Sequence, residues 1–418
     1  MKIKLTDLNN VMNKVSVATN KDDLVRIAFG QTEQAGNKIN LISFLANNGA
    51  GLQVQANMAY AGNAHPNGTY TVKASVMNSI LKAYEALGIE FVSLEGTEGQ
   101  LFVKNDNGKQ GLQVSDKKVG EIGIKETQVG ALYALNLNLK ELVAGVKSVA
   151  YAIDPDVSYS NGIYFEATES GFKLSAIGKG YGAQSNIKAT FTKDISKEPF
   201  SRDFFILPTF VKLLNVLKGN KDGEVTGYVS DKYLVLRDGE GTLCIVTLSG
   251  AQFPKKDLEK VFVKKDQPLT AVEGFDFTIK KKILEAATQL AECTTANKAM
   301  LIKAIKMGET VELLTGSEAN PQTIGDCSVN LIQESAGMVF TTSFMNALLA
   351  NIQDEKVTIR VANGAYLIVY GGDSTAPSAF LMGRKDSPSV KNANAEKNNA
   401  EKETTDKKEA PKAESKQA

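Results

Sequence analysis

Residues 206–219 read ILPTFVKLLNVLKG, a stretch that begins with an apolar pair and a proline and ends with a glycine. Its apolar residues recur at the i, i+3, i+4, i+7 spacing of one helix face: Phe210, Leu213, Leu214 and Leu217. Pro208 suits a first helical turn and Gly219 suits the residue just past a helix end. The stretch therefore predicts a helix of about three turns with one apolar side and one basic side.

The same apolar spacing occurs at five other places in the chain. These stripes are Leu8, Val11, Met12 and Val15; Met77, Ile80, Leu81 and Tyr84; Leu139, Leu142, Val143 and Val146; Ile283, Ala286, Ala287 and Leu290; and Met345, Leu348, Leu349 and Ile352. A single short helix of this kind is marginal in water, so we expect each stripe to pack on a sheet.

The surroundings of the six stripes repeat as well. A short strand-like run precedes each stripe. The first, third and fifth stripes follow MKIKL, YALNL and FDFTI, and the second, fourth and sixth follow TYTVKA, DFFILP and MVFTT. After the second, fourth and sixth stripes come alternating runs joined by Gly, Asn, Asp or Ser, such as KVTIRVANGAYLIVYGGD, which predict β-hairpins. The chain is thus expected to be α+β: three tandem copies of one unit, each with two short helices on antiparallel strands.

Composition and length agree with a globular protein of several domains. The chain has 418 residues, 43% hydrophobic residues, 23% charged residues and a net charge of +1. We expect domains at 1–128, 129–260 and 261–385, followed by a disordered charged tail at 386–418, which is rich in Lys, Glu, Asn and Ala. The N-terminus lacks a long apolar run, and no stretch is long and apolar enough to predict a membrane span, so a cytoplasmic protein is expected.

The helix sides away from the apolar stripes carry more lysines than acidic residues. The lysines are Lys14, Lys82, Lys140, Lys147, Lys212, Lys218, Lys280, Lys281 and Lys282. The acidic residues are Asp7, Glu85, Glu141, Glu285 and Glu292. This bias has the sign that a phosphate-facing surface requires, although an ordinary solvated face has the same appearance.

The residues that support catalysis or metal binding are largely missing from the sequence. His65 is the one histidine and lies in a turn-rich stretch, which argues against a histidine-based triad or a zinc site. GKGYG at 178–182 has no amphipathic helix directly after it, so a surface loop is preferred over a phosphate loop. Asp154 and Asp156 flank Pro155 and are interpreted as turn residues. The three cysteines lack a paired spacing and are interpreted as reduced. We therefore predict a protein without cofactor, metal or enzymatic activity.

Several stretches resemble the bacterial sliding clamp, the beta subunit of the replicative DNA polymerase III. LNLKELVAGVKSVAYAIDPDVSYSNGIYFEATESGFKLSAIG is similar to the start of the middle domain of that family. ILPTFVKLLNVLKG is similar to the helix of that domain's second half, and LSGAQFPKKDLEKVF to the segment at its exit. FLMGRK resembles the C-terminal strand, where the family has Met-Pro-Met-Arg. The resemblance covers residues 1–385 and is strongest in the middle third.

The resemblance implies a head-to-tail homodimeric ring whose helices line a central hole. With helices about 10 Å across, twelve of them give a circumference of roughly 120 Å, which leaves room for a DNA duplex. The implied function is to encircle double-stranded DNA without sequence preference and to tether the replicative polymerase subunit. The clamp loader and other proteins carrying clamp-binding motifs are further implied partners.

The resemblance also implies two sets of site residues. The expected DNA-facing residues are the nine lysines named above together with Lys21 and Tyr159. The expected partner-peptide cleft between the second and third domains consists of Ile177, Tyr181, Pro254, Leu258, Tyr366, Leu381, Met382 and Arg384. IGKGYG at 177–182 and LMGR at 381–384 depart from the family pattern, so an altered partner specificity is expected. The alternative interpretation is that the apolar residues of this set belong to the hydrophobic core and bind no partner.

Two other classes of protein are weighed against the clamp. A β-rich structural or surface protein of three tandem domains would explain the repeat, but the lysine bias of the helices and the absent signal peptide argue against it. An enzyme would require a nucleophile with a base, a metal cluster or a phosphate loop, and the sequence offers none of these patterns.

Overall fold

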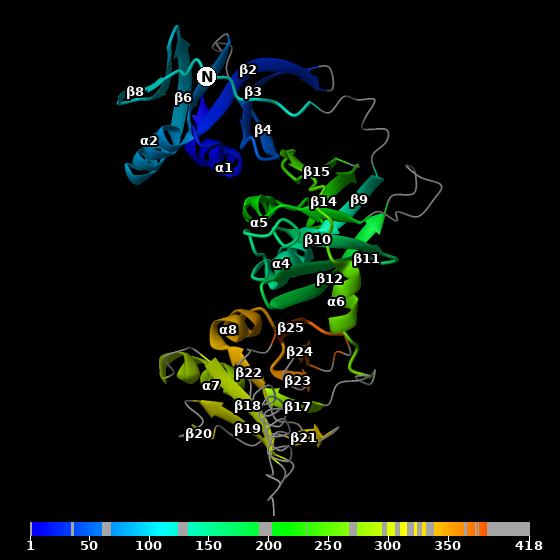
Figure 1. Ribbon diagram of the computed structural model, residues 1–418. Coiled ribbons are helices and arrows are strands. Elements are labelled where there is room, and N and C mark those ends of the chain that lie inside the picture. The colour runs from blue at the N-terminus through cyan, green and yellow to red at the C-terminus, as the bar shows by residue number, and fades with distance from the viewer. Residues whose placement is uncertain are drawn as a thin grey trace, which may run out of the picture. The chain divides into compact units, whose positions relative to one another are not determined.

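The computed structural model describes most of residues 2–382, and Figure 1 shows its helices and strands. The chain divides into two compact units. The residues outside the description are 1, 35–36, 61–67, 124–132, 192–202, 231, 267–273, 295–298, 306–309, 316–321, 324–327, 332–337, 363–365, 373, 375 and 383–418. Unit 1 comprises 1–150, 155–174 and 186–253, and unit 2 comprises 151–154, 175–185 and 254–418. The predicted tail at 386–418 lies outside the described residues, and the three predicted domain boundaries stay predictions.

The described residues of unit 1 form four helices and sixteen strands, two of which, β11 and β12, continue into unit 2. The helices are α1 (Leu5–Ser16), α2 (Ala74–Ala86), α4 (Leu139–Ala150) and α5 (Thr209–Leu214). The strands are β1 (Ile3–Lys4), β2 (Leu24–Gln34), β3 (Asn37–Asn47), β4 (Leu52–Tyr60), β5 (Thr69–Lys73), β6 (Phe91–Thr97), β7 (Gln100–Asn105), β8 (Gly108–Gln113), β9 (Tyr133–Asn138), β10 (Ile163–Thr168), β11 (Gly171–Gly178), β12 (Tyr181–Phe191), β13 (Phe204–Ile206), β14 (Glu224–Val229), β15 (Tyr233–Arg237) and β16 (Leu243–Thr247).

Unit 2 contains the remaining helices and strands. The helices are α6 (Lys255–Val261), α7 (Lys281–Thr294) and α8 (Thr342–Ala350). The strands are β17 (Gly274–Lys280), β18 (Ala299–Ile305), β19 (Thr310–Thr315), β20 (Gln322–Thr323), β21 (Ser328–Leu331), β22 (Met338–Thr341), β23 (Lys356–Ala362), β24 (Tyr366–Gly371) and β25 (Ala379–Met382).

The sixfold strand–helix pattern is confirmed. Five helices start at the residue directly after a strand, in the pairs β1–α1, β5–α2, β9–α4, β17–α7 and β22–α8. The sixth, α5, follows β13 after only two residues, Leu207 and Pro208. The three predicted hairpins also form, as β6–β7, β14–β15 and β23–β24.

A long antiparallel sheet runs through unit 1 and joins residues far apart in the sequence. Its neighbouring strands are β5, β2, β3, β4, β16, β15, β14, β9 and the second part of β12. The central pairing of β4 with β16 places Val54 opposite Cys244, a buried pair. A separate four-stranded sheet has the order β1-β6-β7-β8. Burial alternates along β14, and Val225 and Val229 are among its buried residues. This alternation is typical of a strand with one face packed on the core.

The helices of unit 1 bury the predicted apolar stripes against these sheets. In α1 Leu8, Met12 and Val15 are fully buried, and in α2 Met77 and Leu81 are fully buried. The two helices lie side by side (Figure 1), and Asn78 Nδ2 donates a hydrogen bond to Ser16 Oγ at 3.0 Å. In the absence of side-chain caps at their first residues, the burial of these stripes is the main force that holds the short helices.

The opening stretch forms a shorter helix than predicted, although its four stripe residues are all buried. Helix α5 ends at Leu214, and the following residues continue in turns, with Val216 N donating to Leu213 O at 3.0 Å. Gly219 does not act as a left-handed cap. A Cβ there would lie 2.7 Å from the Gly223 carbonyl carbon, so the glycine serves a close backbone crossing.

Unit 2 is built on the antiparallel order β21-β17-β23-β24-β25, and the start of β12 pairs with β25. Strands β20, β19, β18 and β22 form a second sheet in that order. Helices α7 and α8 pack side by side (Figure 1) on a core that includes Phe277, Phe340 and Met345.

The predicted stripe of α7 is wrong by one residue. Leu284, Ala287 and Ala291 are fully buried, whereas Leu290 is 40% exposed. Thr288 is also fully buried, and its hydroxyl donates to Leu284 O at 2.6 Å, which satisfies the polar group inside the core. Because alanine and leucine occur on more than one side of this helix, spacing alone does not select the buried side.

Candidate DNA interface and partner site

Most of the predicted DNA-facing residues are exposed. Those with exposed side chains are Lys21, Lys82, Lys140, Lys147, Tyr159, Lys212, Lys218, Lys280 and Lys282. Lys281 is half-buried at the start of α7, where its Nζ donates to Ile352 O at 2.7 Å and lies 3.6 Å from Glu285 Oε1. The structure thus leaves nine of the eleven side chains available to a partner, while Lys281 caps the end of α8.

Lys14 is buried, so its prediction as a DNA-facing residue is wrong. Its Nζ lies 2.6 Å from both Asp238 Oδ2 and Glu240 Oε2, and 3.0 Å from Thr242 Oγ1. The side chain is 4% exposed and that of Asp238 is fully buried. Two carboxylates on the β15–β16 turn therefore hold this cation inside unit 1, which removes it from the set of possible phosphate contacts.

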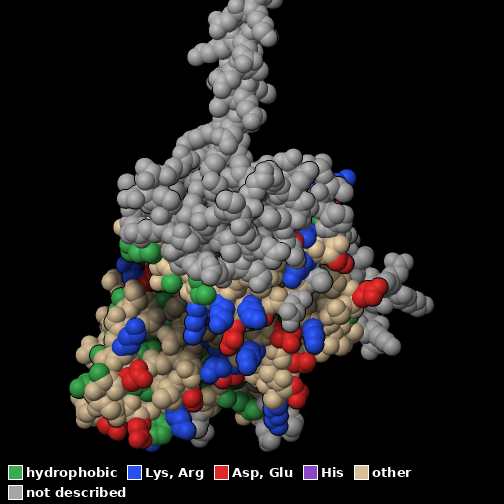
Figure 2. Space-filling view, turned by 90° about the horizontal axis from the view of Figure 1, so that it is seen from below, with side chains coloured by type: hydrophobic (Ala, Val, Ile, Leu, Met, Phe, Trp, Pro, Cys, Tyr) green, Lys and Arg blue, Asp and Glu red, His purple; other side chains and the backbone are tan. Residues whose placement is uncertain are grey.

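On one face of the molecule, the positive side chains are mixed with negative ones. On the face shown in Figure 2, Lys and Arg side chains are interspersed with Asp and Glu. This mixture agrees with the net charge of +1. Any preference for phosphate must therefore be sought at particular helices.

The predicted partner cleft separates into surface and interior residues of unit 2. Met382 is 45% exposed, and Ile177, Tyr181, Pro254 and Tyr366 are half-buried. Two further members, Leu258 and Leu381, are 3% and 1% exposed, as expected for core residues. Arg384 lies outside the described residues.

GKGYG at 178–182 forms the tight turn between β11 and β12. Gly180 has a φ of +95°, and its N–H donates to Gly178 O at 2.9 Å. No helix follows the turn, which confirms that the stretch is not a helix-capped phosphate loop. Met382 N donates to Gly180 O at 2.6 Å, and a Cβ on Gly180 would lie 3.5 Å from Met382 Cβ. The turn therefore holds the backbone of Met382 through this hydrogen bond and packs against its side chain.

The other two glycines of this turn make room for aromatic rings. Gly182 faces Phe380 across the β12–β25 pair, and a Cβ on Gly182 would lie 2.3 Å from Phe380 Cε1. A Cβ on Gly178 would lie 2.7 Å from Tyr181 Cζ. Phe380, which sequence reasoning missed, is buried and packs edge-on against Phe262 at 5.2 Å between ring centroids. Large side chains thus occupy the space that the glycines leave free.

Tyr181 belongs to an aromatic stack beside this turn. Its ring lies parallel to that of Tyr151, with centroids 6.4 Å apart, and 4.2 Å from that of Phe344. Burial and the nearby Asp154 carboxylate raise the pKa of Tyr181, so the hydroxyl is neutral at physiological pH and is available to donate a hydrogen bond. Tyr181 and Met382 together give this surface an apolar character with one polar hydroxyl.

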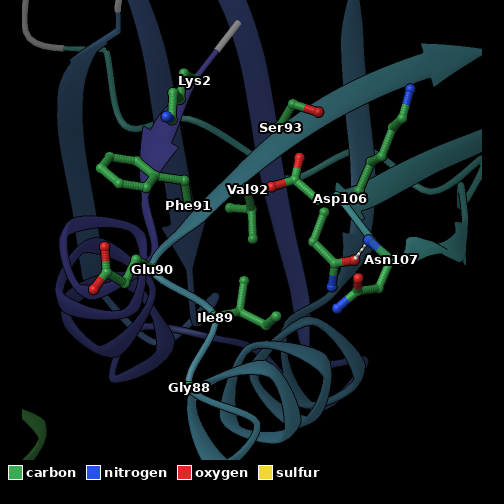
Figure 3. Close-up of a pocket in the computed structure, with 11 residues that line it drawn as sticks. Lys2, Gly88, Ile89, Glu90, Phe91, Val92, Ser93, Asp106 and Asn107 are labelled. Atoms are coloured by element: carbon green, nitrogen blue, oxygen red, sulfur yellow. Dashed lines mark hydrogen bonds between the residues drawn. The ribbon is translucent and has the colours of Figure 1, made fainter.

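A depression of about 550 Å³ lies in unit 1, where the loop after α2 leads into β6 (Figure 3). Its lining includes Lys2, Glu90, Phe91 and Asp106, with Lys2 Nζ 4.1 Å above the Phe91 ring. No residue of this depression was predicted as a site. Among the described residues there is no group of three or more His, Cys, Asp or Glu placed to hold a metal ion.

Two helices carry apolar side chains on their solvent side. Val76 is 43% exposed on α2, Leu87 is 74% exposed directly after it, and Leu290 is 40% exposed on α7. Exposed apolar residues on a helix face are common at protein–protein contacts. None of the helices in the described part of the chain is long and apolar enough to cross a membrane.

Solved structures of bacterial sliding clamps match nearly the whole chain. The DNA polymerase III subunit beta from Pseudomonas aeruginosa matches with a TM-score of 0.73 and 14% identity, over 92% of this chain and 99% of that one. The beta subunit from Thermotoga maritima gives 0.72 and 13%, over 92% and 98%. The sliding clamp from Bacillus subtilis gives 0.73 and 12%, over the same shares. No family model and no curated protein matches the sequence. At this identity the match establishes the fold: the chain has the fold of the bacterial DNA polymerase III beta subunits, the sliding clamps, in a divergent form.

Proposed function

We propose that this protein is a DNA polymerase processivity factor, a ring that encircles duplex DNA and slides along it. The observation that carries the proposal is the match to sliding clamps over 92% of the chain, end to end with those proteins. The exposed lysines of the helices support it, because sequence-independent binding to duplex DNA rests on contacts to phosphates. The protein acts as a non-enzymatic tether in the cytoplasm, without a cofactor.

The ring requires two chains, each contributing three clamp domains at 1–128, 129–260 and 261–385. We place the contact between the α2 side of one chain and the α7 side of a second copy. The exposed apolar residues Leu87 and Leu290 support this choice, because joining two apolar helix faces removes both from water. A closed head-to-tail ring uses each face once.

Partners bind at the surface around the β11–β12 turn, where Met382, Tyr181 and Ile177 are accessible. One of the matching structures is a sliding clamp bound to griselimycin, which shows that a protein of this fold can hold a ligand. The proposed partners are the replicative polymerase subunit, the clamp loader and other proteins with clamp-binding motifs. The rings of Tyr181 and Phe380 pack against Gly178 and Gly182 and shape this surface. We therefore expect it to prefer a partner peptide motif different from that of other clamps.

The test is retention on DNA of different topology. The full-length protein is loaded by the clamp loader of its own host onto a nicked circular plasmid, and free protein is removed by gel filtration. The proposal expects the protein to elute with the circular DNA and to be released when one restriction cut linearises it. Equal retention on circular and linear DNA, or none on either, contradicts the proposal.

A further inference from the structure

Five neighbouring strands of unit 2 place one residue each in a continuous cross-strand row. In order, the row consists of Asp276 on β17, Arg360 on β23, Ile368 on β24, Phe380 on β25 and Gly182 on β12. Residues directly opposite one another on neighbouring strands point to the same side of a sheet. The row therefore connects a charged pair at one end with the glycine turn of the partner surface at the other.

Arg360 and Asp276 form a bidentate ion pair on this face of the sheet. The Arg360 Nε and Nη2 atoms donate to the two Asp276 carboxylate oxygens, each at 2.8 Å. The flanking residues Ile359 and Val361 belong to the core on the other face. The Arg360 side chain is nevertheless only 4% exposed, so another part of the chain must cover it.

The cover is the chain segment that directly follows α6. Arg360 Nη2 donates to Lys265 O at 2.6 Å, and Nη1 donates to Lys264 O at 3.4 Å. The Tyr370 hydroxyl donates to Val263 O at 2.7 Å, and its ring centroid lies 5.9 Å from the Arg360 guanidinium carbon. This segment belongs to no helix or strand, so side chains of β23 and β24 hold three of its successive carbonyls in place.

The anchored segment, residues 262–265, also contacts the partner end of the row. Its first residue, Phe262, is 9% exposed and packs edge-on against Phe380, with 5.2 Å between ring centroids. The Phe380 ring in turn fills the space at Gly182, where a Cβ would lie 2.3 Å from Phe380 Cε1. The position of Phe262 therefore determines how the Phe380 ring packs against the β11–β12 turn.

We propose that Arg360 is a positioning residue of the partner surface. With Asp276 it fixes residues 262–265, which hold Phe262 against Phe380 and so set the shape of the surface at the β11–β12 turn. The inference rests on the proposed function and refines it, and Arg360 itself does not touch the partner. A lysine could not replace it, because a single ammonium lacks the planar fork that serves two carboxylate oxygens and two carbonyls at once.

The first test measures hydrogen–deuterium exchange of the full-length protein by mass spectrometry. Arg360→Met alone would leave the Asp276 carboxylate without its cation, so the variant is Arg360→Met/Asp276→Leu, an apolar pair that keeps unit 2 folded. The Met382 N–H, which donates to Gly180 O at 2.6 Å, is expected to exchange about tenfold faster than in the natural protein. The fragment 345–349 of α8 is expected to keep its rate.

Thr288→Val is the matched control in the same unit. It removes a buried hydrogen bond, from Thr288 Oγ1 to Leu284 O at 2.6 Å, but lies on α7 rather than on the face that carries Arg360. Exchange at Met382 is expected to equal that of the natural protein.

The second test measures binding of the replicative polymerase subunit of the same host by surface plasmon resonance. Arg360→Met/Asp276→Leu is expected to bind it roughly 2- to 30-fold more weakly. Retention on circular plasmid is expected to stay unchanged. In a Phe262→Leu background the double change is expected to add little, because both changes act on the Phe380 ring.

The outcomes separate the positioning role from the proposed function. Unchanged exchange at Met382, or an equal acceleration in the fragment 345–349, overturns the inference, because the ion pair would then be no more than a general stabiliser of unit 2. Unchanged affinity for the polymerase subunit, or full additivity with Phe262→Leu, overturns it as well. If the natural protein does not bind the subunit while Met382 responds as expected, the proposed partner function is overturned and the anchoring by Arg360 stands.

Discussion

Lys14 Nζ lies 2.6 Å from Asp238 Oδ2, although 224 residues separate the two in the chain. Both side chains are buried, and Asp238 also accepts N–H groups of Glu240 and Thr242 at 3.0 and 2.8 Å. The pair joins α1 to the β15–β16 turn, beside the pairing of β4 with β16. It therefore fixes the N-terminal helices of unit 1 to the strands that follow much later in the sequence.

Replacing Lys14 by methionine is expected to destabilise unit 1 strongly. The substitution keeps the apolar stem but leaves Asp238 charged and buried without its cation, which costs about 3–5 kcal/mol. Urea denaturation followed by circular dichroism measures the free energy of unfolding. In the double variant Lys14→Met/Asp238→Asn, the unpaired charge is absent, so the loss is expected to be smaller than the sum of the two single losses.

The exposed pair of Lys104 and Glu95 provides the matched control. Its Nζ–Oε1 distance is 3.0 Å, yet both side chains are nearly half exposed. Lys104→Met is therefore expected to change the free energy of unfolding by less than about 1 kcal/mol. Additive losses in the Lys14 and Asp238 cycle, or a Lys14→Met loss no larger than that of Lys104→Met, would show that the buried pair does not hold unit 1 together.

Gly182→Ala tests the packing of Phe380 at the partner surface. Because the new methyl would lie 2.3 Å from the Phe380 ring, strand β12 or the ring must shift, at a cost of about 1–3 kcal/mol. The double variant Gly182→Ala/Phe380→Leu is expected to recover part of this loss in thermal or urea unfolding. Gly30→Ala is the control, because its Cβ meets nothing within 4 Å. A Gly182→Ala protein as stable as the Gly30→Ala protein contradicts the packing described.

The stability of unit 2 is expected to fall at high pH through Tyr370. Burial raises the pKa of Tyr370 to about 12, and its hydroxyl donates to Val263 O at 2.7 Å. An unfolded tyrosine has a pKa near 10, so the folded state keeps a proton that the unfolded state loses as pH rises. The contribution is complete below about pH 10 and is lost between about pH 10 and 12.

Urea unfolding at several pH values checks this assignment with the variant Tyr370→Phe. The variant loses one hydrogen bond at every pH, about 1 kcal/mol, but its free energy of unfolding is expected to decline less steeply between about pH 10 and 12. Equal slopes for the variant and the natural protein over that interval would place the titrating group elsewhere.

Leu290→Asp is expected to weaken the proposed dimer. A carboxylate at this exposed position of α7 must be desolvated when the second copy covers it, which opposes association. Sedimentation velocity over a range of protein concentrations is expected to show monomers where the natural protein is dimeric. Met382→Asp places the same charge on an equally exposed apolar residue at the partner surface and is expected to leave the dimer intact. Equal dimer dissociation constants for Leu290→Asp and the natural protein would exclude α7 from the contact.

Much of the fold follows from the sequence because short helices with a single apolar side have only one way to pack. The stripes of α1, α2, α5 and α8 identify buried residues such as Met12, Leu81, Phe210 and Met345. The α7 stripe could not be chosen in this way, because Leu284 and Leu290 are equally apolar and only the tertiary environment decides which is covered.

The site was less predictable because its geometry depends on residues far apart in the sequence. Lys14 has the spacing of a solvent-facing lysine, and its burial follows from Asp238, which no local pattern connects to it. Phe380 is an ordinary strand residue until Gly182 is placed opposite it. The sequence shows the three glycines of GKGYG, but it does not show which rings pack against them. One ring, Tyr181, belongs to the same stretch, and the other, Phe380, comes from a distant strand.

The most direct test of the central claim is to image the purified full-length protein by negative-stain electron microscopy at a concentration where the dimer forms. The clamp account predicts closed rings of six lobes with an open centre wide enough for a DNA duplex. Compact or elongated particles without a central hole would contradict it.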